Sequence, residues 1–252
     1  MVFLLINLGA VGNGGRKRAK RAVCLANLRQ LTLAWTQYAN YNDDMIVNGD
    51  AGHNHVDQKA WVGRCWYSQY HQGAQLPKED QEKAIKEGAL WPYCKEIKLY
   101  RCPSGYPGEM LTYAIVDSMN GYPQPGSPRG RGPVDVIDRL LIKNRMQIHS
   151  PKDRIVFLDQ GWVTPDSYAV FQNRMEWWED PVARHGDGMP VSLADGHAKY
   201  WKWKGAETIE YARKCVQTRP PGRLVPATPE GREDLYKVQK AVWWEVGYTP
   251  TF

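Results

Sequence analysis

The apolar residues of segment 16–42 recur with the period of an α-helix. Neither proline nor glycine interrupts the segment. Its apolar positions alternate between steps of four and three residues, which places them on one helix face. These positions, which we call the seam, are Cys24, Leu28, Leu31, Trp35 and Tyr38. The spacing predicts an amphipathic stem helix of about 25 residues, whose seam packs either on the chain's own sheet or on neighbouring stems.

A short apolar run precedes the stem. Residues 1–11 are mostly apolar, and the glycine-rich residues 12–15 are expected to end the run. A membrane-spanning helix needs about 20 apolar residues, and a secretory signal carries its basic residues before its apolar core rather than after it. We therefore interpret residues 1–15 as the residual tail of a longer apolar segment whose start lies upstream.

The clearest hairpin pattern surrounds residue 195. An apolar run at 191–194 and an alternating run at 197–204 are separated only by Asp195 and Gly196. Because Asp-Gly accommodates the positive φ angles of a two-residue turn, the pattern predicts a β-hairpin with its tip at these residues. Alternate aromatic rings in the second run, Trp201 and Trp203, are expected to fill the core.

Several short β-rich runs separated by long loops favour an antiparallel sheet over a parallel α/β array. The runs lie at 111–117, 155–159 and 168–172, and an aromatic-rich strand candidate lies at 61–70. Residues 121–133 are rich in glycine and proline, so they are expected to form a loop.

Three further helices are expected outside the stem. A charged surface helix at 77–87 should end at Gly88, a second helix should span 206–216, and Thr228-Pro229 should start a third. The predicted fold class is α+β, with a long N-terminal helix packed on a small antiparallel sheet with long loops. We divide the chain into an apolar segment at 1–15, the stem at 16–42, a β-rich head at 43–205 and a helical extension at 206–252.

Positive charge is concentrated near the N-terminus. The chain has 33 Lys and Arg against 27 Asp and Glu, a net charge of +6. The basic cluster consists of Arg16, Lys17, Arg18, Lys20 and Arg21. The remainder is close to neutral, so no nucleic-acid partner is expected. Basic residues beside an apolar stretch are typical of a segment at an anionic membrane surface, although a solvated helix face has the same pattern.

The chain has five cysteines, so at least one stays unpaired whichever disulfides form within it. Cys94 and Cys102 close a short loop and could form a disulfide in an oxidising compartment. Cys24, Cys65 and Cys215 lack the CxxC or CxxH context of a zinc cluster, so no zinc site is predicted from their spacing.

Three sequence strings together carry a family resemblance. His185 is followed by nine residues and then Asp195-Gly196, within R-H-G-D-G and L-A-D-G-H-A-K-Y-W-K-W. Residues 20–31 read K-R-A-V-C-L-A-N-L-R-Q-L, and residues 90–103 begin L-W-P-Y and end Y-R-C-P. Over roughly residues 16–203, the chain resembles the prepilin-type proteins with an H-x9-DG signature, which are relatives of type II secretion pseudopilins.

The resemblance implies a pilin-like fold and a structural role in the cell envelope. The expected function is that of a non-enzymatic subunit or accessory protein of a pilus or pseudopilus, exported beyond the cytoplasmic membrane. The expected partners are other pilin-like subunits and an inner-membrane assembly machinery. The family's Gly-Phe-Thr-Leu-Ile-Glu type processing site has no counterpart in this sequence.

Candidate metal ligands surround the predicted hairpin. Carboxylates at strand ends and glycine-rich turns suit calcium, which takes six to eight oxygen ligands, and major pseudopilins have a calcium-binding loop in their C-terminal region. The candidate ligands are Asp159, His185, Asp187, Asp195 and His197. The alternative is that these side chains cap turns. His53 and His55 form a second candidate within a polar loop, which is more simply explained as solvated.

Two other functions stay open at this stage. Trp177 and Trp178 could form a platform for sugar rings or a partner protein, which would make the chain an extracytoplasmic binding module. Asp187 and Asp195 could act as the acid and base of a hydrolase, with or without a metal. However, the sequence contains no G-x-S-x-G, H-E-x-x-H, Walker or G-x-G-x-x-G motif.

Overall fold

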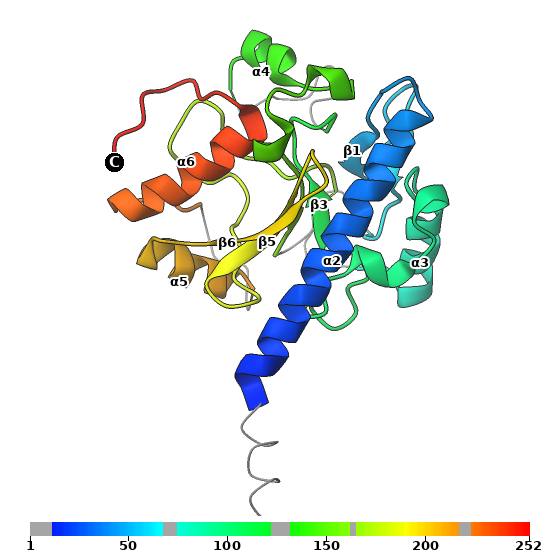
Figure 1. The fold of residues 1–252 in the computed structure, drawn as a ribbon, viewed down its shortest axis with the longest axis horizontal. Coiled ribbons are helices and arrows are strands. Elements are labelled where there is room, and N and C mark those ends of the chain that lie inside the picture. Colours follow the sequence, from blue (N-terminus) through cyan, green and yellow to red (C-terminus); the bar gives the residue numbers. More distant parts are fainter. Residues whose placement is uncertain (1–11, 68–74, 122–131, 162–164, 217–222) are drawn as a thin grey trace, which may run out of the picture.

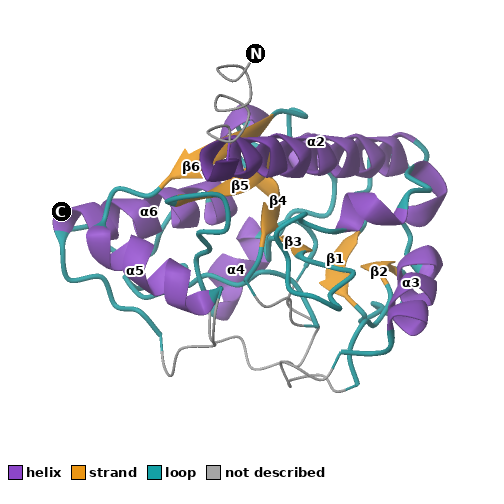
Figure 2. Ribbon diagram, turned by 90° about the horizontal axis from the view of Figure 1, so that it is seen from below, coloured by secondary structure: helices purple, strands orange, loops and turns teal. Residues whose placement is uncertain are grey.

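A long helix, α2, lies along a four-stranded antiparallel sheet (Figures 1 and 2). The structure is a computed structural model that describes residues 12–67, 75–121, 132–161, 165–216 and 223–252. The helices are α2 (Gly12–Asn40), α3 (Lys78–Glu87), α4 (Val134–Leu140), α5 (Ala206–Cys215) and α6 (Pro229–Trp243). The strands are β1 (Asn48–Ala51), β2 (Ala60–Val62), β3 (Tyr113–Ile115), β4 (Ile155–Asp159), β5 (Gly188–Leu193) and β6 (Ala198–Lys202). The predicted α+β class is confirmed.

The predicted stem is a continuous helix. α2 begins at Gly12, before the expected start at Arg16, so residues 12–15 belong to the helix. A glycine costs a helix only about 1 kcal/mol relative to alanine, which the following helix-forming residues offset.

The seam of α2 packs on the chain's own sheet. α2 contacts β4, β5 and β6, and the seam forms part of the hydrophobic core. Its buried members are Cys24, Leu28, Leu31 and Trp35, and Tyr38 is partly buried against them. A buried hydrogen bond fixes the contact, because the Thr32 Oγ1 donates to Ser192 Oγ of β5 at 2.6 Å. Of the two predicted alternatives, packing within the chain is the one observed.

The first turns of α2 project from the body. Residues 14–20 are all exposed, and Figure 1 shows this end of the helix extending away from the sheet. Most of the basic cluster therefore lies on a helix end that the body does not cover. Arg21 contacts the body, because its guanidinium carbon lies 4.6 Å from the ring centroid of Tyr200. Among the described residues, no helix has both the length and the apolar character of a membrane span.

The sheet ends in the predicted hairpin. The strand order is β3-β4-β5-β6, and the β5–β6 register runs from Gly188↔Lys202 to Ser192↔Ala198. The hairpin is present, but its turn has three residues rather than the predicted two, because the Leu193 amide donates to the His197 carbonyl at 2.8 Å. Gly196 adopts a positive φ of 91°, and Asp195 does not. All residues of β3, β4 and β5 are buried, which places these strands within the core, whereas the edge strand β6 is partly exposed.

The polar segments 42–44 and 49–55 were predicted to form a solvated loop, but residues 49–51 belong to the buried strand β1, which pairs in parallel with β2. Asn48 and Asp50 are buried because they have local partners. Asn48 Nδ2 donates to the His53 carbonyl at 2.8 Å. The ring of His55 lies 2.9 Å from an Asp50 oxygen, so this imidazole forms a local polar contact.

The strand predicted at 168–172 is wrong. Within that segment Tyr168 forms an isolated bridge to Val116. The carbonyl of Val170 accepts a hydrogen bond from Trp243 Nε1 at 2.8 Å, and the carbonyl of Phe171 accepts one from Gln239 Nε2 at 2.7 Å. Side chains of α6 therefore take the place of a neighbouring strand.

Three predictions fall partly outside the described residues. Of the apolar segment predicted at 1–15, residues 1–11 lie outside them. The glycine- and proline-rich loop lies mostly at 122–131, and the aromatic strand candidate ends at 68–70. Within the described part, that candidate is limited to β2. Helix α4, which begins directly after residue 133, was not predicted.

The C-terminal extension shares the core of the head. Both of its predicted helices are present as α5 and α6, and Thr228 Oγ1 caps α6 by accepting from the Gly231 amide at 3.1 Å. α5 and α6 pack together at the hairpin end of the sheet (Figures 1 and 2). Arg154 ties α6 to the sheet, since its Nη2 donates to the Val242 carbonyl at 2.6 Å. Leu235 and Val242 belong to the same hydrophobic core cluster as Leu28 of α2.

Candidate metal centre

Four side chains with metal-binding atoms meet beneath α2. Cys24 comes from α2, Cys102 follows the 3₁₀ helix Ile97–Tyr100, Asp159 ends β4, and His185 lies in the loop before β5. One ligand atom from each residue lies within 4.8 Å of all the others, and all four residues are buried. The crossing of α2 over the sheet brings the cysteine of the seam to the end of β4.

Hydrogen bonds orient the two sulfurs. Cys102 Sγ lies 3.1 Å from His185 Nε2 and accepts from the Ser104 amide at 3.4 Å. Cys24 Sγ lies 3.0 Å from the hydroxyl of Tyr113 on β3. Both sulfurs are therefore held within the cluster by groups from different segments.

A buried arginine supports the carboxylate. Arg184 Nη1 donates to Asp159 Oδ1 at 2.9 Å, and its Nη2 donates to the Gly161 carbonyl at 2.7 Å. The same guanidinium lies 3.7 Å from Glu109 Oε2. Since Arg184 occupies Oδ1, Oδ2 is the oxygen of Asp159 left for another partner.

Burial disfavours the charged forms of most groups around the cluster. It raises the pKa of the Cys24 thiol and of the Asp159 carboxyl, although Arg184 opposes the latter shift. Burial, with the nearby charge of Arg184, lowers the pKa of His185 to about 4. Burial also raises the pKa of Glu109 to about 7. Arg184 stays charged, since Asp159 and Glu109 outweigh its burial and raise its pKa.

The structure brings together only two of the five predicted calcium ligands, Asp159 and His185. Asp187 instead pairs with Arg213 at 2.5 Å. Asp195 holds its own turn by accepting from the His197 amide at 3.0 Å, and its other oxygen lies 3.0 Å from the His197 ring. The predicted five-residue site is therefore wrong, because turn capping engages the residues of the hairpin tip.

Strand β5 also separates the predicted acid and base. Asp187 precedes β5 and Asp195 follows it beyond Leu193. A strand advances about 3.3 Å per residue, so the two carboxylates lie at opposite ends of a span of roughly 20 Å. This exceeds the separation of paired glycosidase carboxylates, about 5–9.5 Å, and the pair cannot act together.

The H-x9-DG string of this sequence has a direct structural meaning. Its histidine, His185, belongs to the buried cluster, whereas Asp195 and Gly196 form the exposed turn. The nine intervening residues contain the whole of β5. The signature spacing is thus the distance along one strand from the cluster to the hairpin tip.

The predicted Cys94–Cys102 disulfide is wrong, since all five cysteines are free. Cys94 Sγ donates to the Leu90 carbonyl at 3.3 Å and lies 3.1 Å from the Tyr100 hydroxyl. Cys102 lies beyond the intervening 3₁₀ helix and faces His185. Sequence spacing could not reveal that Cys102 lies beside Cys24 in the fold, because the four cluster residues share no local motif.

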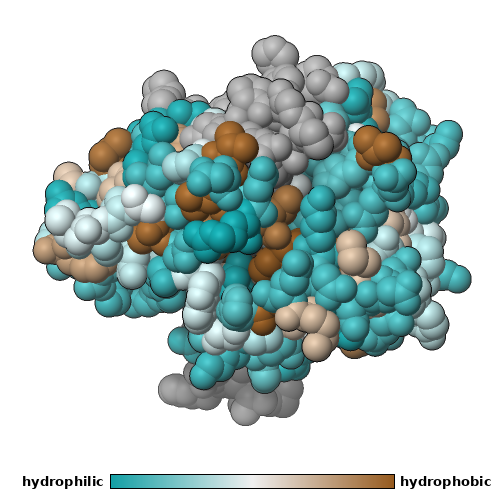
Figure 3. Space-filling view, turned by 90° about the horizontal axis from the view of Figure 1, so that it is seen from above, coloured by the Kyte–Doolittle hydropathy of each residue, from teal (hydrophilic) through white to brown (hydrophobic). Residues whose placement is uncertain are grey.

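The predicted tryptophan platform is also wrong. Trp177 is buried and packs edge-to-face on Trp203 with ring centroids 6.0 Å apart. Trp178 is partly buried between Phe171 and Arg223. The expected core position of Trp201 and Trp203 is confirmed. On the face in Figure 3, apolar side chains form small separate spots within a mostly hydrophilic surface.

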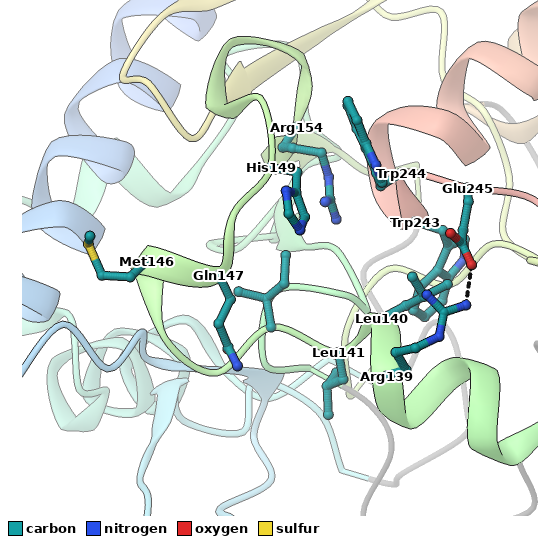
Figure 4. Close-up of a pocket in the computed structure, with 11 residues that line it drawn as sticks. Arg139, Leu140, Leu141, Met146, Gln147, His149, Arg154, Trp243, Trp244 and Glu245 are labelled. Carbon is teal, nitrogen blue, oxygen red and sulfur yellow. Dashed lines mark hydrogen bonds and ion pairs between the residues drawn. The ribbon is translucent and has the colours of Figure 1, made fainter.

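A cavity of about 500 Å³ lies between the end of α4 and the end of α6 (Figure 4). Its charged side chains already have partners, since Arg139 pairs with Glu245 and Arg154 donates to the carbonyls of Ala241 and Val242. The exposed His149 ring stacks on Trp244 at 6.1 Å between centroids. The lining therefore offers no convergent set of groups comparable to the buried cluster.

Comparisons with protein-family models, with curated proteins and with solved structures find no match to this chain.

Proposed function

We propose that the chain is a non-enzymatic structural subunit or accessory protein of a pilus- or pseudopilus-like assembly in the cell envelope. The observation that carries the proposal is the form of α2. Its C-terminal part is embedded in the sheet through the seam, and its first turns are exposed and basic. The resemblance of residues 16–203 to prepilin-type proteins supports the same role.

The embedded part of the helix defines which surface is left for assembly. Because the seam is buried within the chain, contacts with neighbouring subunits have to use the projecting turns or the surface of the head. Positive side chains on the projecting turns suit an anionic membrane surface. The partners would be other pilin-like subunits and the machinery that assembles them at the inner membrane.

A charge-reversal experiment in the producing cell tests the proposal. Arg16, Lys17 and Arg18 are changed together to glutamate, and the matched control is Arg29→Glu, an exposed arginine of α2 beside the body. Each basic residue near an anionic surface contributes about 1 kcal/mol, so the triple change should reduce envelope association roughly 100-fold or more.

The readouts are fractionation and in-cell cross-linking of the full chain. The proposal expects wild type and Arg29→Glu to sediment with the envelope and to cross-link into multi-subunit ladders, and the triple variant to lose both. A wild-type chain that stays monomeric and outside the envelope fraction would contradict the proposal, as would a triple variant that assembles like wild type.

A further inference from the structure

We propose that Cys24, Cys102, Asp159 and His185 form a structural zinc site that fastens α2 to the sheet. Their ligand atoms lie within 4.8 Å of one another in the buried interior. Zinc bonds measure about 2.0–2.3 Å, so side-chain adjustments of about an ångström bring all four atoms onto one ion. The proposal is independent of the assembly role, since it concerns only the interior of one chain.

Polar atoms in the cluster lack the partners that burial requires. Apart from the adjacent Cys102 thiol, Oδ2 of Asp159 has no hydrogen-bond partner among the described residues. Within the same part of the chain, Nδ1 of His185 has none either. Buried polar atoms without partners are destabilising, and a cation bound by Asp159 Oδ2 would give that oxygen a partner.

The donor set selects the metal class. Two thiolates, one imidazole and one carboxylate match the tetrahedral nitrogen, sulfur and oxygen coordination of zinc. Calcium takes six to eight oxygens, whereas only one of these four residues supplies oxygen. Four protein ligands without an open position are typical of a structural zinc rather than a catalytic one.

A positive side chain lies beside the charge that zinc binding would create. As zinc enters, the two thiols release two protons, and the resulting complex with the Asp159 carboxylate and a neutral imidazole carries a net charge of −1. The guanidinium of Arg184, bonded to the other oxygen of Asp159 at 2.9 Å, is the opposite charge next to this complex. An opposite charge in contact reduces the large desolvation cost of an isolated buried ion.

The ion would connect segments that are far apart in the chain. Cys24 holds α2, Asp159 holds the end of β4, and His185 precedes β5. A zinc ion binding all of them would cross-link the stem helix to the sheet. Since such an ion binds the folded chain in preference to the unfolded one, it should raise the unfolding temperature, and the rise should grow with the logarithm of the zinc concentration above Kd.

The test measures metal binding by the full chain, purified and kept reduced with a phosphine. Zinc is titrated against a chromophoric competitor, and cobalt is used as a spectroscopic substitute. The expected result is one zinc per chain, a rise in unfolding temperature on zinc addition, and the sulfur-to-cobalt charge-transfer and intense visible bands of a tetrahedral thiolate site.

Cysteine variants provide matched controls. Cys24→Ser and Cys102→Ser should weaken zinc binding by more than the 10–100-fold that loss of an outer-shell partner costs. Cys65→Ser and Cys215→Ser, which change equally buried cysteines outside the cluster, should leave the stoichiometry at one. If a cluster variant fails to fold, the wild-type zinc stoichiometry and cobalt spectrum decide the question alone.

Two results would overturn the proposal. One is the absence of stoichiometric zinc and of cobalt bands in the reduced, folded wild-type chain. The other is a chain isolated without metal whose mass is two hydrogens below that of the reduced chain. If digestion of this chain yields the Cys24 and Cys102 peptides linked by a disulfide, the disulfide is the native state of these sulfurs.

Discussion

Replacing Leu31 by alanine separates the two predicted uses of the stem helix. Leu31 is fully buried in the seam, whereas Leu33, two residues further along α2, is 50% exposed. A Leu→Ala change in a packed core lowers the free energy of unfolding by about 2.7–5.0 kcal/mol, because it removes buried apolar surface and leaves a cavity. Leu33→Ala should change it by no more than about 0.5 kcal/mol.

The measurement is urea unfolding of the full chain, followed by tryptophan fluorescence and far-UV circular dichroism. With a slope of about 1–3 kcal/mol/M, the midpoint for Leu31→Ala should fall by roughly 1 M or more. For a chain of this size, 1 kcal/mol corresponds to about 2–4 °C, so a thermal scan should show a decrease of roughly 5–20 °C. Each variant is measured at two protein concentrations.

Equal stabilities of the two variants would refute the packing described for α2. A loss of stability in Leu31→Ala that depends on protein concentration would instead indicate that the seam contacts a second copy. The expected loss is independent of concentration, since the core cluster lies within one chain.

Three further changes test local features of the fold. Ser192→Ala removes one buried partner of the Thr32 hydroxyl and leaves the Leu28 carbonyl as its acceptor at 2.9 Å, so chemical denaturation should show a loss of about 0.5–1.5 kcal/mol in the free energy of unfolding; an unchanged unfolding midpoint would contradict the role given to this bond. Burial alone would raise the pKa of Glu207, but hydrogen bonds from two amides and a hydroxyl at the start of α6 hold it below the ordinary 4.5. The ionised Glu207 therefore stabilises the fold above pH 4.5, and this contribution is lost as the pH falls through its lowered pKa. Glu207→Gln should make the free energy of unfolding depend less on pH between about pH 6 and pH 2. An unchanged pH dependence in this range would contradict the prediction. Gly188→Ala would place a Cβ 2.0 Å from the Trp201 carbonyl oxygen and should cost about 2–4 kcal/mol in thermal unfolding, whereas Gly14→Ala, with open space around it, should be neutral or stabilising by up to about 1 kcal/mol.

The sequence predicted the elements that have a strong apolar period. The spacing of the seam predicted α2, and the Asp-Gly dipeptide predicted the β5–β6 hairpin, because both patterns depend only on residues close together in the sequence. The polar strand β1 was missed since Asn48 and Asp50 are buried through hydrogen bonds rather than apolar character. The segment 168–172 has a strand-like composition, but side chains of α6 satisfy its backbone.

The candidate site was only partly predictable for a related reason. Asp159 and His185 were selected because they lie at strand ends, but the same reasoning also selected Asp195 and His197, which belong to the turn. Cys24 and Cys102 are 78 positions apart in numbering, and only the crossing of α2 over the sheet makes them neighbours. A local spacing rule cannot detect ligands that come from four separate segments.

The bond between Thr32 and Ser192 spans 160 positions, and it joins the first described helix to the last hairpin. At about 5–20 residues per second, a ribosome needs roughly 8–32 s to synthesise the intervening chain. During that time the leucines of α2 have no sheet to cover them. The apolar seam of α2 is therefore synthesised, and left uncovered, before the strands that bury it exist.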